Sequence, residues 1–598
     1  MKIASDLIAE FLEKKEIKVA FGIIGSANSY IYDSIAKRGY TKIVNVHHEQ
    51  TAVLAAGAYY RASGKMAVAL ATAGPGVANT ITGIISCWAD SNPVLIISGQ
   101  ESTRYVSKHK NLRMIGTQGF DIAKMVSDVT KYSDTVLSAS EVQDKLESSF
   151  RETKNGRYGP SLLAIPFDMQ SCEVEEREWS EESTLEDEID NQHVDYVLNC
   201  LNNAKRPVIL GGNGIKLSGS KDNFVKLVNK LKVPTLLSWA GIDILPDNNE
   251  NFYGKAGIYG QRSSNFVIQN SDLLLVLGSR LAIPQVGYDF NDFAPGAKII
   301  VVDIDAEEAK KYEEHCDRLI IGDCGQLIDK LLNRIDEISP SINEWKRKCD
   351  EWKEKYPVVM EEHLDAGFLN SYRFMDKISD YLKDDQIIVT DMGTALLSGH
   401  QAIKLKEGQS MFTSTGLGEM GYGLPAAIGA AFAAEGKEVL CLNCDGGMMM
   451  NLQEMQTIKH YNLPVKIIIF NNDGYLMIKH TQKMLFKGKY VSTNKDTGLT
   501  LPDYQKVSRA FGFKTNSIYN WEEFDESISQ FLNANGPAVC EVFMDPEQAF
   551  IPKVKGVKKE DGTIVPPPLE EMSPLLPLEQ VKNEMIIGLN KKSLIIER

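Results

Sequence analysis

Short apolar runs alternate with helical spacing of apolar residues along most of this 598-residue chain. The runs at 19–24, 66–71 and 94–98 are short enough for buried strands, and segments with helical periodicity separate them. This alternation predicts parallel sheets covered by helices. Because a chain of this length exceeds what one hydrophobic core can hold, we expect several such α/β units.

Interruptions in the alternation divide the chain into three expected α/β domains, each with a doubly wound parallel sheet, and an irregular tail. Residues 172–190 are dense in Glu and Asp and poor in apolar side chains, which is typical of a solvated linker. Three consecutive prolines at 566–568 favour a loop or lid near the C-terminus. We therefore expect domains at 1–171, 191–340 and 366–548, an acidic linker at 172–190, a linker helix at 341–365 and a tail at 549–598.

Composition limits the classes of partner. The net charge of −15 repels a polyphosphate backbone, so nucleic acid is not an expected partner. The nine cysteines are an odd number without a paired framework, as in reduced cytoplasmic proteins. The lone pair Cys441 and Cys444 fits a buried strand better than a zinc site. No apolar run approaches the roughly 18 residues that span a bilayer, so we expect a soluble cytoplasmic protein.

The sharpest chemical signal is an aspartate and an asparagine that each follow an apolar run. Asp445 comes after the run at 439–442, and Asn472 comes 27 positions later, after the run at 465–470. Because the carboxyl ends of parallel strands share one edge of a sheet, we expect the two side chains to meet there. Mg²⁺ prefers oxygen ligands, so we assign to it Asp445, Asn472 and the main-chain carbonyl of Gly474.

Two glycines follow the aspartate and point to a diphosphate group beside the metal. Gly446 and Gly447 let the backbone approach such a group, and the N-terminus of the helix expected after them favours negative charge. The alternative interpretation is an ordinary strand-to-helix turn with a surface pair of asparagines.

Further segments occur in a fixed order around this turn. They are NVHHEQ at 45–50 with AAGAY at 55–59, AGPGVAN at 73–79, DSNPV at 90–94 and GLGEMGYGLPAA at 416–427. Together with the turn and the asparagines, they resemble the thiamine diphosphate enzymes, and within that family the acetolactate synthase branch. The resemblance extends over nearly the whole chain. It implies that thiamine diphosphate and Mg²⁺ bind between a pyrimidine-binding first domain and a diphosphate-binding third domain.

The same resemblance implies roles for individual residues. Glu49 is the glutamate that shares a proton with the aminopyrimidine ring, and Met420, near Gly418, is the apolar wedge that sets the shape of the cofactor. Gln118 contacts the donor keto acid, and Gly25 faces the same space. The implied reaction is decarboxylation of a 2-keto acid such as pyruvate, with transfer of the acyl unit to a carbonyl acceptor.

Three positions around the expected thiamine diphosphate and substrate site depart from the family pattern. Cys444 replaces the first glycine of the diphosphate turn, which we expect to crowd the turn without removing a metal ligand. Thr117 with Gln118 stands where the family has a Phe-Gln pair, and Thr481 stands where it has a tryptophan against the acceptor. This loss of bulk favours a large acceptor such as a keto-sugar nucleotide. The alternative is an acetolactate synthase, which joins two pyruvates.

The middle domain resembles the FAD-binding part of acetolactate synthases. Glycine backbone at its strand ends would meet a pyrophosphate, and a carboxylate would accept a ribose hydroxyl. The candidate residues are Gly212, Asn213, Gly214, Gly278, Arg280, Asp303 and Asp323. Ala282 and Pro284 replace a family Asp and Arg, so the alternative is a vestigial nucleotide fold.

The expected partners are a small keto acid and a carbonyl acceptor, with no nucleic acid and no membrane. Because the family builds its site from two subunits, we expect a homodimer or homotetramer. Two alternatives to this function belong to other classes. One is a nicotinamide dehydrogenase, and the other is a non-catalytic regulatory paralogue that binds the thiamine cofactor. Retention of Glu49, Asp445, Asn472 and Met420 argues against the regulatory paralogue, and the lack of a GxGxxG segment after a strand argues against the dehydrogenase.

Overall fold

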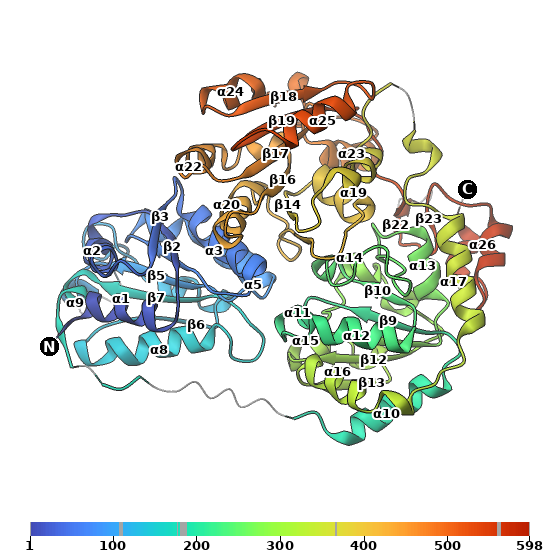
Figure 1. The fold of residues 1–598 in the computed structure, drawn as a ribbon, viewed down its shortest axis with the longest axis horizontal. Coiled ribbons are helices and arrows are strands. Elements are labelled where there is room, and N and C mark those ends of the chain that lie inside the picture. Colours follow the sequence, from blue (N-terminus) through green and yellow to red (C-terminus); the bar gives the residue numbers. More distant parts are fainter. Residues whose placement is uncertain are drawn as a thin grey trace. The chain divides into compact units, whose positions relative to one another are not determined.

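The computed structural model describes residues 2–106, 112–175, 177–179, 188–364, 367–558, 564–596 and 598. Within these ranges lie three parallel sheets flanked by helices and three two-stranded antiparallel ribbons (Figure 1). The three parallel sheets confirm the doubly wound α/β class. The first and third sheets belong to one compact unit and the second sheet to another. No helix in the described ranges is both long and apolar enough to cross a membrane.

The first sheet has six parallel strands in the order β3-β2-β4-β5-β7-β6. The chain runs from β2 to β3 on one side and then crosses to β4 on the other side of β2, so the switch point lies between β2 and β4. Open α/β sheets bind ligands at this place. The strands are β2 (Val19–Gly22), β3 (Lys42–Asn45), β4 (Val68–Ala71), β5 (Leu95–Gln100), β6 (Tyr132–Thr135) and β7 (Ser161–Pro166), and the main helices are α1 (Ala4–Lys14), α2 (Ser29–Arg38), α3 (Glu49–Ser63), α5 (Ile81–Ala89) and α8 (Val142–Glu152).

The third sheet repeats this topology in the order β15-β14-β16-β17-β19-β18. Its switch point lies between β14 and β16, which are followed by Asp391 and Asp445. The same rule therefore marks this edge as a binding edge. The strands are β14 (Ile387–Thr390), β15 (Ser410–Phe412), β16 (Val439–Cys444), β17 (Val465–Asn471), β18 (Lys514–Ile518) and β19 (Ala538–Phe543), and the main helices are α20 (Gly423–Ala433), α22 (Met455–His460), α23 (Leu476–Phe486), α24 (Tyr504–Ala510) and α25 (Phe524–Leu532).

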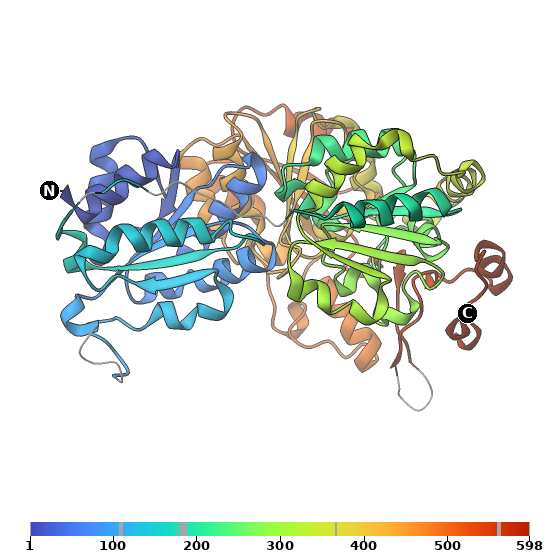
Figure 2. The ribbon, with the colours of Figure 1, turned by 90° about the horizontal axis from the view of Figure 1, so that it is seen from below.

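The second sheet has five parallel strands in the order β10-β9-β11-β12-β13, with helices on both faces (Figure 2). Its switch point lies between β9 and β11, which are followed by Gly212 and Gly278. The strands are β9 (Pro207–Gly211), β10 (Thr235–Leu237), β11 (Leu273–Leu277), β12 (Lys298–Asp303) and β13 (Arg318–Ile321), and the main helices are α10 (Asn191–Asn203), α12 (Lys221–Leu231), α13 (Arg262–Gln269), α16 (Cys324–Asn333) and α17 (Asn343–Lys355).

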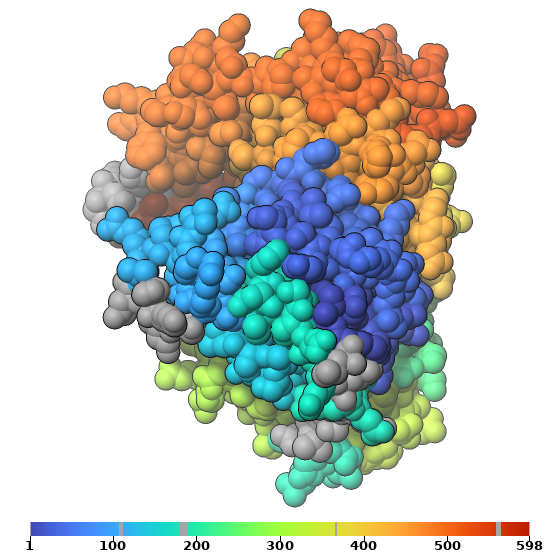
Figure 3. All heavy atoms as spheres, turned by 90° about the vertical axis from the view of Figure 1, so that its left-hand side faces the viewer, coloured from blue at the N-terminus to red at the C-terminus, as the bar shows by residue number. Residues whose placement is uncertain are grey.

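Helices α3 and α20 pack together inside the unit that holds the first and third sheets. A Cβ on Gly429 would lie 2.1 Å from the carbonyl oxygen of Ala55, so the two backbones touch where no side chain intervenes. Both helices are buried along most of their length, as expected for helices that are apolar nearly all round. In the space-filling view, blue residues of the first domain adjoin orange residues of the third (Figure 3).

The C-terminal tail is more ordered than the sequence predicted. Its strands β20 (Lys553–Val554) and β23 (Met572–Ser573) pair, and helix α26 (Leu578–Glu584) follows. Leu569 is buried in the core around the second sheet, and its carbonyl oxygen accepts a hydrogen bond from Asn265 (2.8 Å). Burial therefore fixes a segment that the prolines marked as a loop. Residues 559–563 of this tail, and residues 176 and 180–187 of the acidic linker, lie outside the described ranges.

Candidate active site

Two strand ends of the third sheet bring together the residues assigned to a metal. Strands β16 and β17 pair with Cys444 opposite Phe470, so Asp445 and Asn472 follow adjacent strands at one edge. The Asp445 carboxylate accepts hydrogen bonds from the main-chain N–H groups of Asn472 (2.9 Å) and Gly474 (3.2 Å). The three residues therefore form one cluster.

This cluster contains buried oxygen atoms that suit a cation. Asp445 is 1% exposed, and burial raises the pKa of its carboxyl to about 7. The side-chain oxygen of Asn472 is buried without a hydrogen-bond partner. Buried polar atoms are costly unless a partner meets them. A hard divalent ion such as Mg²⁺, which prefers carboxylate and amide oxygens, fits this donor set.

The glycines of the cluster allow its close packing. Gly474 has a φ of +138°, a conformation that favours glycine. A Cβ on Gly447 would lie 2.5 Å from a carboxylate oxygen of Asp391, and a Cβ on Gly446 would lie 2.5 Å from the ring of Tyr475. The turn after Asp445 therefore tolerates no side chains without rearrangement.

Cys444 and the helix after it differ from the sequence prediction. The cysteine does not crowd the turn, because its sulfur accepts the main-chain N–H of Ala395 (3.3 Å) and faces Gly393, which has no side chain. Helix α21 (Asp445–Met448) has only four residues, so it offers one helical turn rather than a long helix. Cys441 is buried in β16, and the described residues contain no group of three or more His, Cys, Asp or Glu side chains that could hold a metal.

Asp391 is a candidate residue that the sequence analysis missed. It follows β14 at the switch point, and it is fully buried. Its two carboxylate oxygens accept hydrogen bonds from the N–H of Gly421 (3.0 and 3.1 Å), and burial raises its pKa to about 7. The bond fixes the residue after Met420. A carboxylate shortly after an apolar run was the signal that identified Asp445, and the same signal would have found Asp391.

Met420 lies against the turn that follows Asp445. Its methyl carbon is 3.2 Å from the position that a Cβ on Gly446 would take. Gly418, two residues earlier, has a φ of +73°, and a Cβ there would lie 2.5 Å from the methyl carbon of Met392. The structure therefore brings the candidate wedge and the candidate metal ligand to one place.

Glu49 is the first residue of α3, in the domain of the first sheet. It is 7% exposed, and its Oε2 accepts a hydrogen bond from the side-chain amide of Asn79 (3.0 Å). Its Oε1 lies 3.1 Å from the position that a Cβ on Gly76 would take. The segment at 73–79 therefore holds one carboxylate oxygen, and the lack of a side chain at Gly76 avoids crowding the other.

Gly25 and Gln118 lie around the same 73–79 segment. A Cβ on Gly25 would lie 2.5 Å from the hydroxyl oxygen of Thr72. The Cβ of Gln118 is 2.9 Å from the position that a Cβ on Gly74 would take, and Gly74 has a φ of +64°. The structure thus places both residues next to the segment that holds the candidate glutamate.

The threonines assigned to the acceptor side are exposed. The main-chain N–H groups of Thr117 and Gln118 both donate to one carboxylate oxygen of Glu101, each at 3.0 Å. Thr481 lies on α23, where its hydroxyl donates to the carbonyl oxygen of Met477 (3.2 Å). Each threonine is placed by contacts within its own domain.

The FAD candidates lie at the carboxyl edge of the second sheet. A Cβ on Gly214 would lie 2.6 Å from the Cα of Gly278, so the two turns pack backbone to backbone. Asp303 accepts the N–H of Asp305 (2.9 Å), and Asp323 caps α16. These contacts stabilise the turns themselves, and the binding of FAD at this edge stays a prediction. The candidates are Gly212, Asn213 and Gly214 after β9, Gly278 and Arg280 after β11, Asp303 at the end of β12 and Asp323 after β13.

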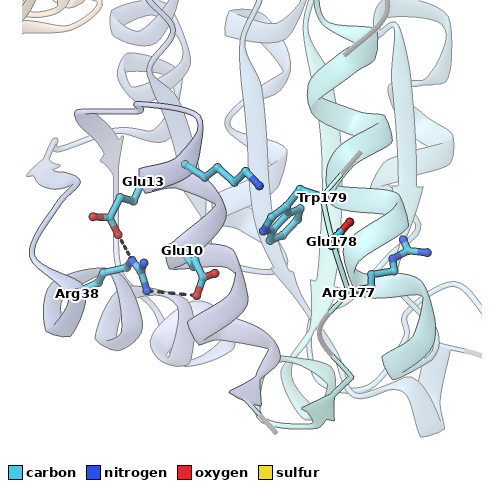
Figure 4. Close-up of a pocket in the computed structure, with 7 residues that line it drawn as sticks. Glu10, Glu13, Arg38, Arg177, Glu178 and Trp179 are labelled. Carbon is cyan, nitrogen blue, oxygen red and sulfur yellow. Dashed lines mark hydrogen bonds and ion pairs between the residues drawn. The ribbon is translucent and has the colours of Figure 1, made fainter. Parts of the chain in front are cut away.

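A separate surface pocket lies on the first domain (Figure 4). Its lining includes Glu10, Glu13 and Arg38, and Arg38 bonds both glutamates. Arg38 ends α2, whereas Gly25 precedes that helix, so the pocket lies at the amino-terminal edge of the sheet. It takes no part in the candidate active site.

Three stretches of the chain match family models of known domains. Residues 2–124 match the thiamine pyrophosphate enzyme, N-terminal TPP binding domain, residues 194–331 match the central domain, and residues 391–542 match the C-terminal TPP binding domain. The chain is also 32% identical over 556 residues to acetolactate synthase isozyme 1 large subunit of Escherichia coli (strain K12), covering 92% of this chain and 95% of that protein. This chain belongs to the thiamine pyrophosphate enzymes.

Other relatives of this thiamine pyrophosphate enzyme carry similar names. Acetolactate synthase isozyme 2 large subunit of Escherichia coli (strain K12) is 29% identical over 92% of this chain and 96% of that protein. Acetolactate synthase large subunit of Lactococcus lactis subsp. lactis (strain IL1403) is 28% identical over 94% and 96%. The resemblance seen in the motifs is therefore confirmed, together with the thiamine diphosphate cofactor and the enzyme class that it implies.

Proposed function

We propose that this enzyme decarboxylates pyruvate and joins the acyl unit to a second pyruvate, which is acetolactate synthesis. The names of its relatives support this reaction better than transfer to a keto-sugar. The observation that carries the chemistry is the unpartnered oxygen of Asn472 beside Asp445 at a switch point. Keto-sugar transfer is the second candidate, and the small exposed Thr481 favours it.

The chain's own residues would hold the cofactor through the cluster at the third sheet. We infer that Asp445, Asn472 and the Gly474 carbonyl would bind Mg²⁺, and that the backbone of Gly446 and Gly447 would hold the diphosphate. When bound, thiamine diphosphate supplies a carbon nucleophile and accepts the electrons released by decarboxylation. Gly418 and Met420 would then shape the space for the reactive ring.

Glu49 is the proposed proton-transfer residue. Asn79 holds its Oε2, which leaves Oε1 as the atom that exchanges a proton with the pyrimidine ring. The burial of the carboxyl group limits the access of water to that proton. Gln118 and Gly25, placed around the same segment, would face the donor keto acid, and the Gln118 amide can donate to its carboxylate.

We propose that a second copy of the chain completes the site. The contacts that place Glu49 lie in the first domain, and those that place Asp445 lie in the third. Large apolar side chains are exposed next in sequence to candidate residues of both domains, with Ile24 before Gly25 at 55%, and Met449 and Met450 after α21 at 44% and 46%. Exposed apolar side chains at a functional edge are typical of an interface. The family resemblance supports a homodimer or homotetramer as this assembly.

Product analysis separates the two candidate acceptors. We expect the wild type, given pyruvate, thiamine diphosphate and Mg²⁺, to form 2-acetolactate. Thr481→Trp should spare this reaction and depress transfer to a bulky ketone about ten- to a hundredfold in kcat/KM, because added bulk narrows an acceptor site. Nuclear magnetic resonance of the products from a panel of ketones measures both, with Thr481→Ser as the matched control. Faster transfer to a keto-sugar than to pyruvate would replace the proposal by its second candidate.

We also propose that the second sheet binds FAD at its glycine turns and at Asp303. Protein purified without denaturation should then be yellow, with one flavin per chain, and reduction of the flavin should change the rate of carboligation little. Absorbance spectra and release of the flavin measure its content. Asp303→Ala should lower that content, because it removes a carboxylate that would accept a ribose hydroxyl. A colourless protein that ignores added FAD would indicate the vestigial fold.

A further inference from the structure

Glu454 is a fully buried carboxylate that connects the third domain to the segment before Glu49. It ends the short helix η10 (Leu452–Glu454). Its Oε1 accepts a hydrogen bond from the main-chain N–H of His47 (3.0 Å), and its Oε2 accepts one from the hydroxyl of Thr457 (2.7 Å). A side chain of one domain therefore fixes the backbone two residues before the candidate proton-transfer residue of the other.

Because His47 lies just before helix α3, its bond to Glu454 orients the start of that helix. Helix α3 begins at Glu49, and His48 is its N-cap. The N–H groups at and before the start of a helix have no acceptor within the helix, so side chains commonly satisfy them. A carboxylate at this end also interacts favourably with the helix dipole. The bond from His47 therefore sets the direction in which the chain enters α3, and with it the origin of the Glu49 side chain.

The same segment also contacts the residues around Met420. The side-chain amide of Asn451 donates to the carbonyl oxygen of Gly421 (2.8 Å). The stretch 445–454 thus carries the candidate metal ligand at its start, fixes the neighbour of Met420 in its middle and fixes His47 at its end. One short stretch therefore contains one part of the candidate machinery and contacts residues next to the other two.

Burying a carboxylate costs more free energy than burying an apolar side chain of the same size. Burial raises the pKa of Glu454, and its bonds to Thr457 and His47 oppose that rise. An apolar side chain of similar size would avoid the cost of burying a charge. What an apolar side chain would not supply is an acceptor for the N–H of His47.

We propose that Glu454 is a positioning residue that sets Glu49 from the diphosphate-binding domain of the same chain. The inference rests on the proposed function of Glu49. Because the proposed dimer shares its sites, Glu454 would join the diphosphate half of one site to the glutamate half of the other.

Two variants and a control distinguish the need for a hydrogen-bond acceptor at position 454 from the need for a negative charge there. Glu454→Gln keeps an acceptor for His47 and a donor toward Thr457, whereas Glu454→Ala removes both contacts. Glu438→Ala is the control, because it removes a partly buried glutamate just before β16, at the opposite edge of the third sheet. If the Ala variant does not fold, Glu454→Asp replaces it, since its shorter side chain withdraws the carboxylate from His47.

The first readout needs no cofactor. Hydrogen exchange followed by mass spectrometry on the cofactor-free chain reports the protection of residues 45–52. We expect exchange to be about tenfold faster in Glu454→Ala and unchanged in Glu454→Gln and in Glu438→Ala. This result supports the contact even if the wild type binds no thiamine diphosphate, an outcome that would refute the proposed function alone.

The second readout is exchange of the C2 proton of thiamine diphosphate bound with Mg²⁺. It should slow about 10- to 100-fold in Glu454→Ala, with cofactor affinity nearly unchanged, and stay near the wild-type rate in Glu454→Gln. Wild-type exchange in a folded, cofactor-loaded Ala variant would overturn the proposal. A Gln variant as slow as the Ala variant, with residues 45–52 still protected, would overturn it as well by showing a need for charge.

Discussion

Glu49→Gln should slow exchange of the C2 proton of bound thiamine diphosphate by about 10²- to 10⁴-fold, the usual contribution of a positioned acid or base. Glutamine has the size of glutamate and can still accept the hydrogen bond from Asn79, so the fold around α3 should persist. Cofactor content should also persist, because the diphosphate and the metal are held by the third domain in this account.

The measurement is rapid mixing with deuterium oxide, followed by acid quenching and nuclear magnetic resonance of the released cofactor. Asn79→Ala is the matched control. It removes the donor to Oε2 but leaves the carboxyl group, so its exchange should be faster than that of Glu49→Gln. Exchange at the wild-type rate in Glu49→Gln would show that Glu49 has no part in proton transfer.

Asp445→Ala, unlike Glu49→Gln, should weaken cofactor binding. We expect a loss of at least about 100-fold in apparent affinity for Mg²⁺ and thiamine diphosphate. Removing even an outer partner of a metal ligand costs about 10- to 100-fold, and Asp445 is a direct ligand in this account. Activity should return only at much higher concentrations of both, if at all. Calorimetric titration of the cofactor with and without Mg²⁺ measures the loss.

Two further variants separate loss of the metal from loss of structure. Asp445→Asn keeps an oxygen that can accept the N–H groups of Asn472 and Gly474, so the cofactor-free protein should melt near the wild-type temperature and still bind Mg²⁺ poorly. Asp473→Asn changes an exposed carboxylate beside the cluster and should bind normally. Wild-type affinity in Asp445→Ala would contradict the metal assignment.

The meeting of Asp445 and Asn472 could be predicted because parallel strands leave a strong signal in the sequence. Strands β16 and β17 are buried on both faces, so they read as continuous apolar runs, and the residues after them must share an edge. Asp391 was accessible to the same rule, but no motif drew attention to it. The sequence could not show that Cys444 fits beside Gly393, because the two residues are brought together only by the pairing of β14 and β16.

Contacts between distant parts of the chain could not be predicted. Glu454 and His47 are 407 positions apart, and nothing in either local sequence marks the bond between them. The tail shows the same limit. Its prolines predicted a loop, whereas Leu569 and Met572 bury themselves in the core around the second sheet. Local signals describe turns and periodicity, and they do not describe which surface a segment will cover.

The acceptor was the hardest part to predict from the sequence. The small side chains of Thr117 and Thr481 predicted an acceptor site large enough for a keto-sugar. The comparisons instead favour acetolactate synthesis. Both side chains are exposed in one chain, so in the proposed dimer a second subunit would determine what covers them. A residue's size alone is therefore a weak guide to the substrate at an edge that a second subunit is proposed to complete.

The central claim is that Glu49 of one subunit and Asp445 of another act in one thiamine diphosphate site. A heterodimer of a Glu49→Gln chain and an Asp445→Ala chain, isolated through two different affinity tags, tests it most directly. With twofold symmetry, one of its sites carries both substitutions and the other carries neither, so the rate of acetolactate formation from pyruvate should be about half that of the wild type. Both parent homodimers should be nearly inactive. A folded heterodimer as inactive as its parents would contradict the account.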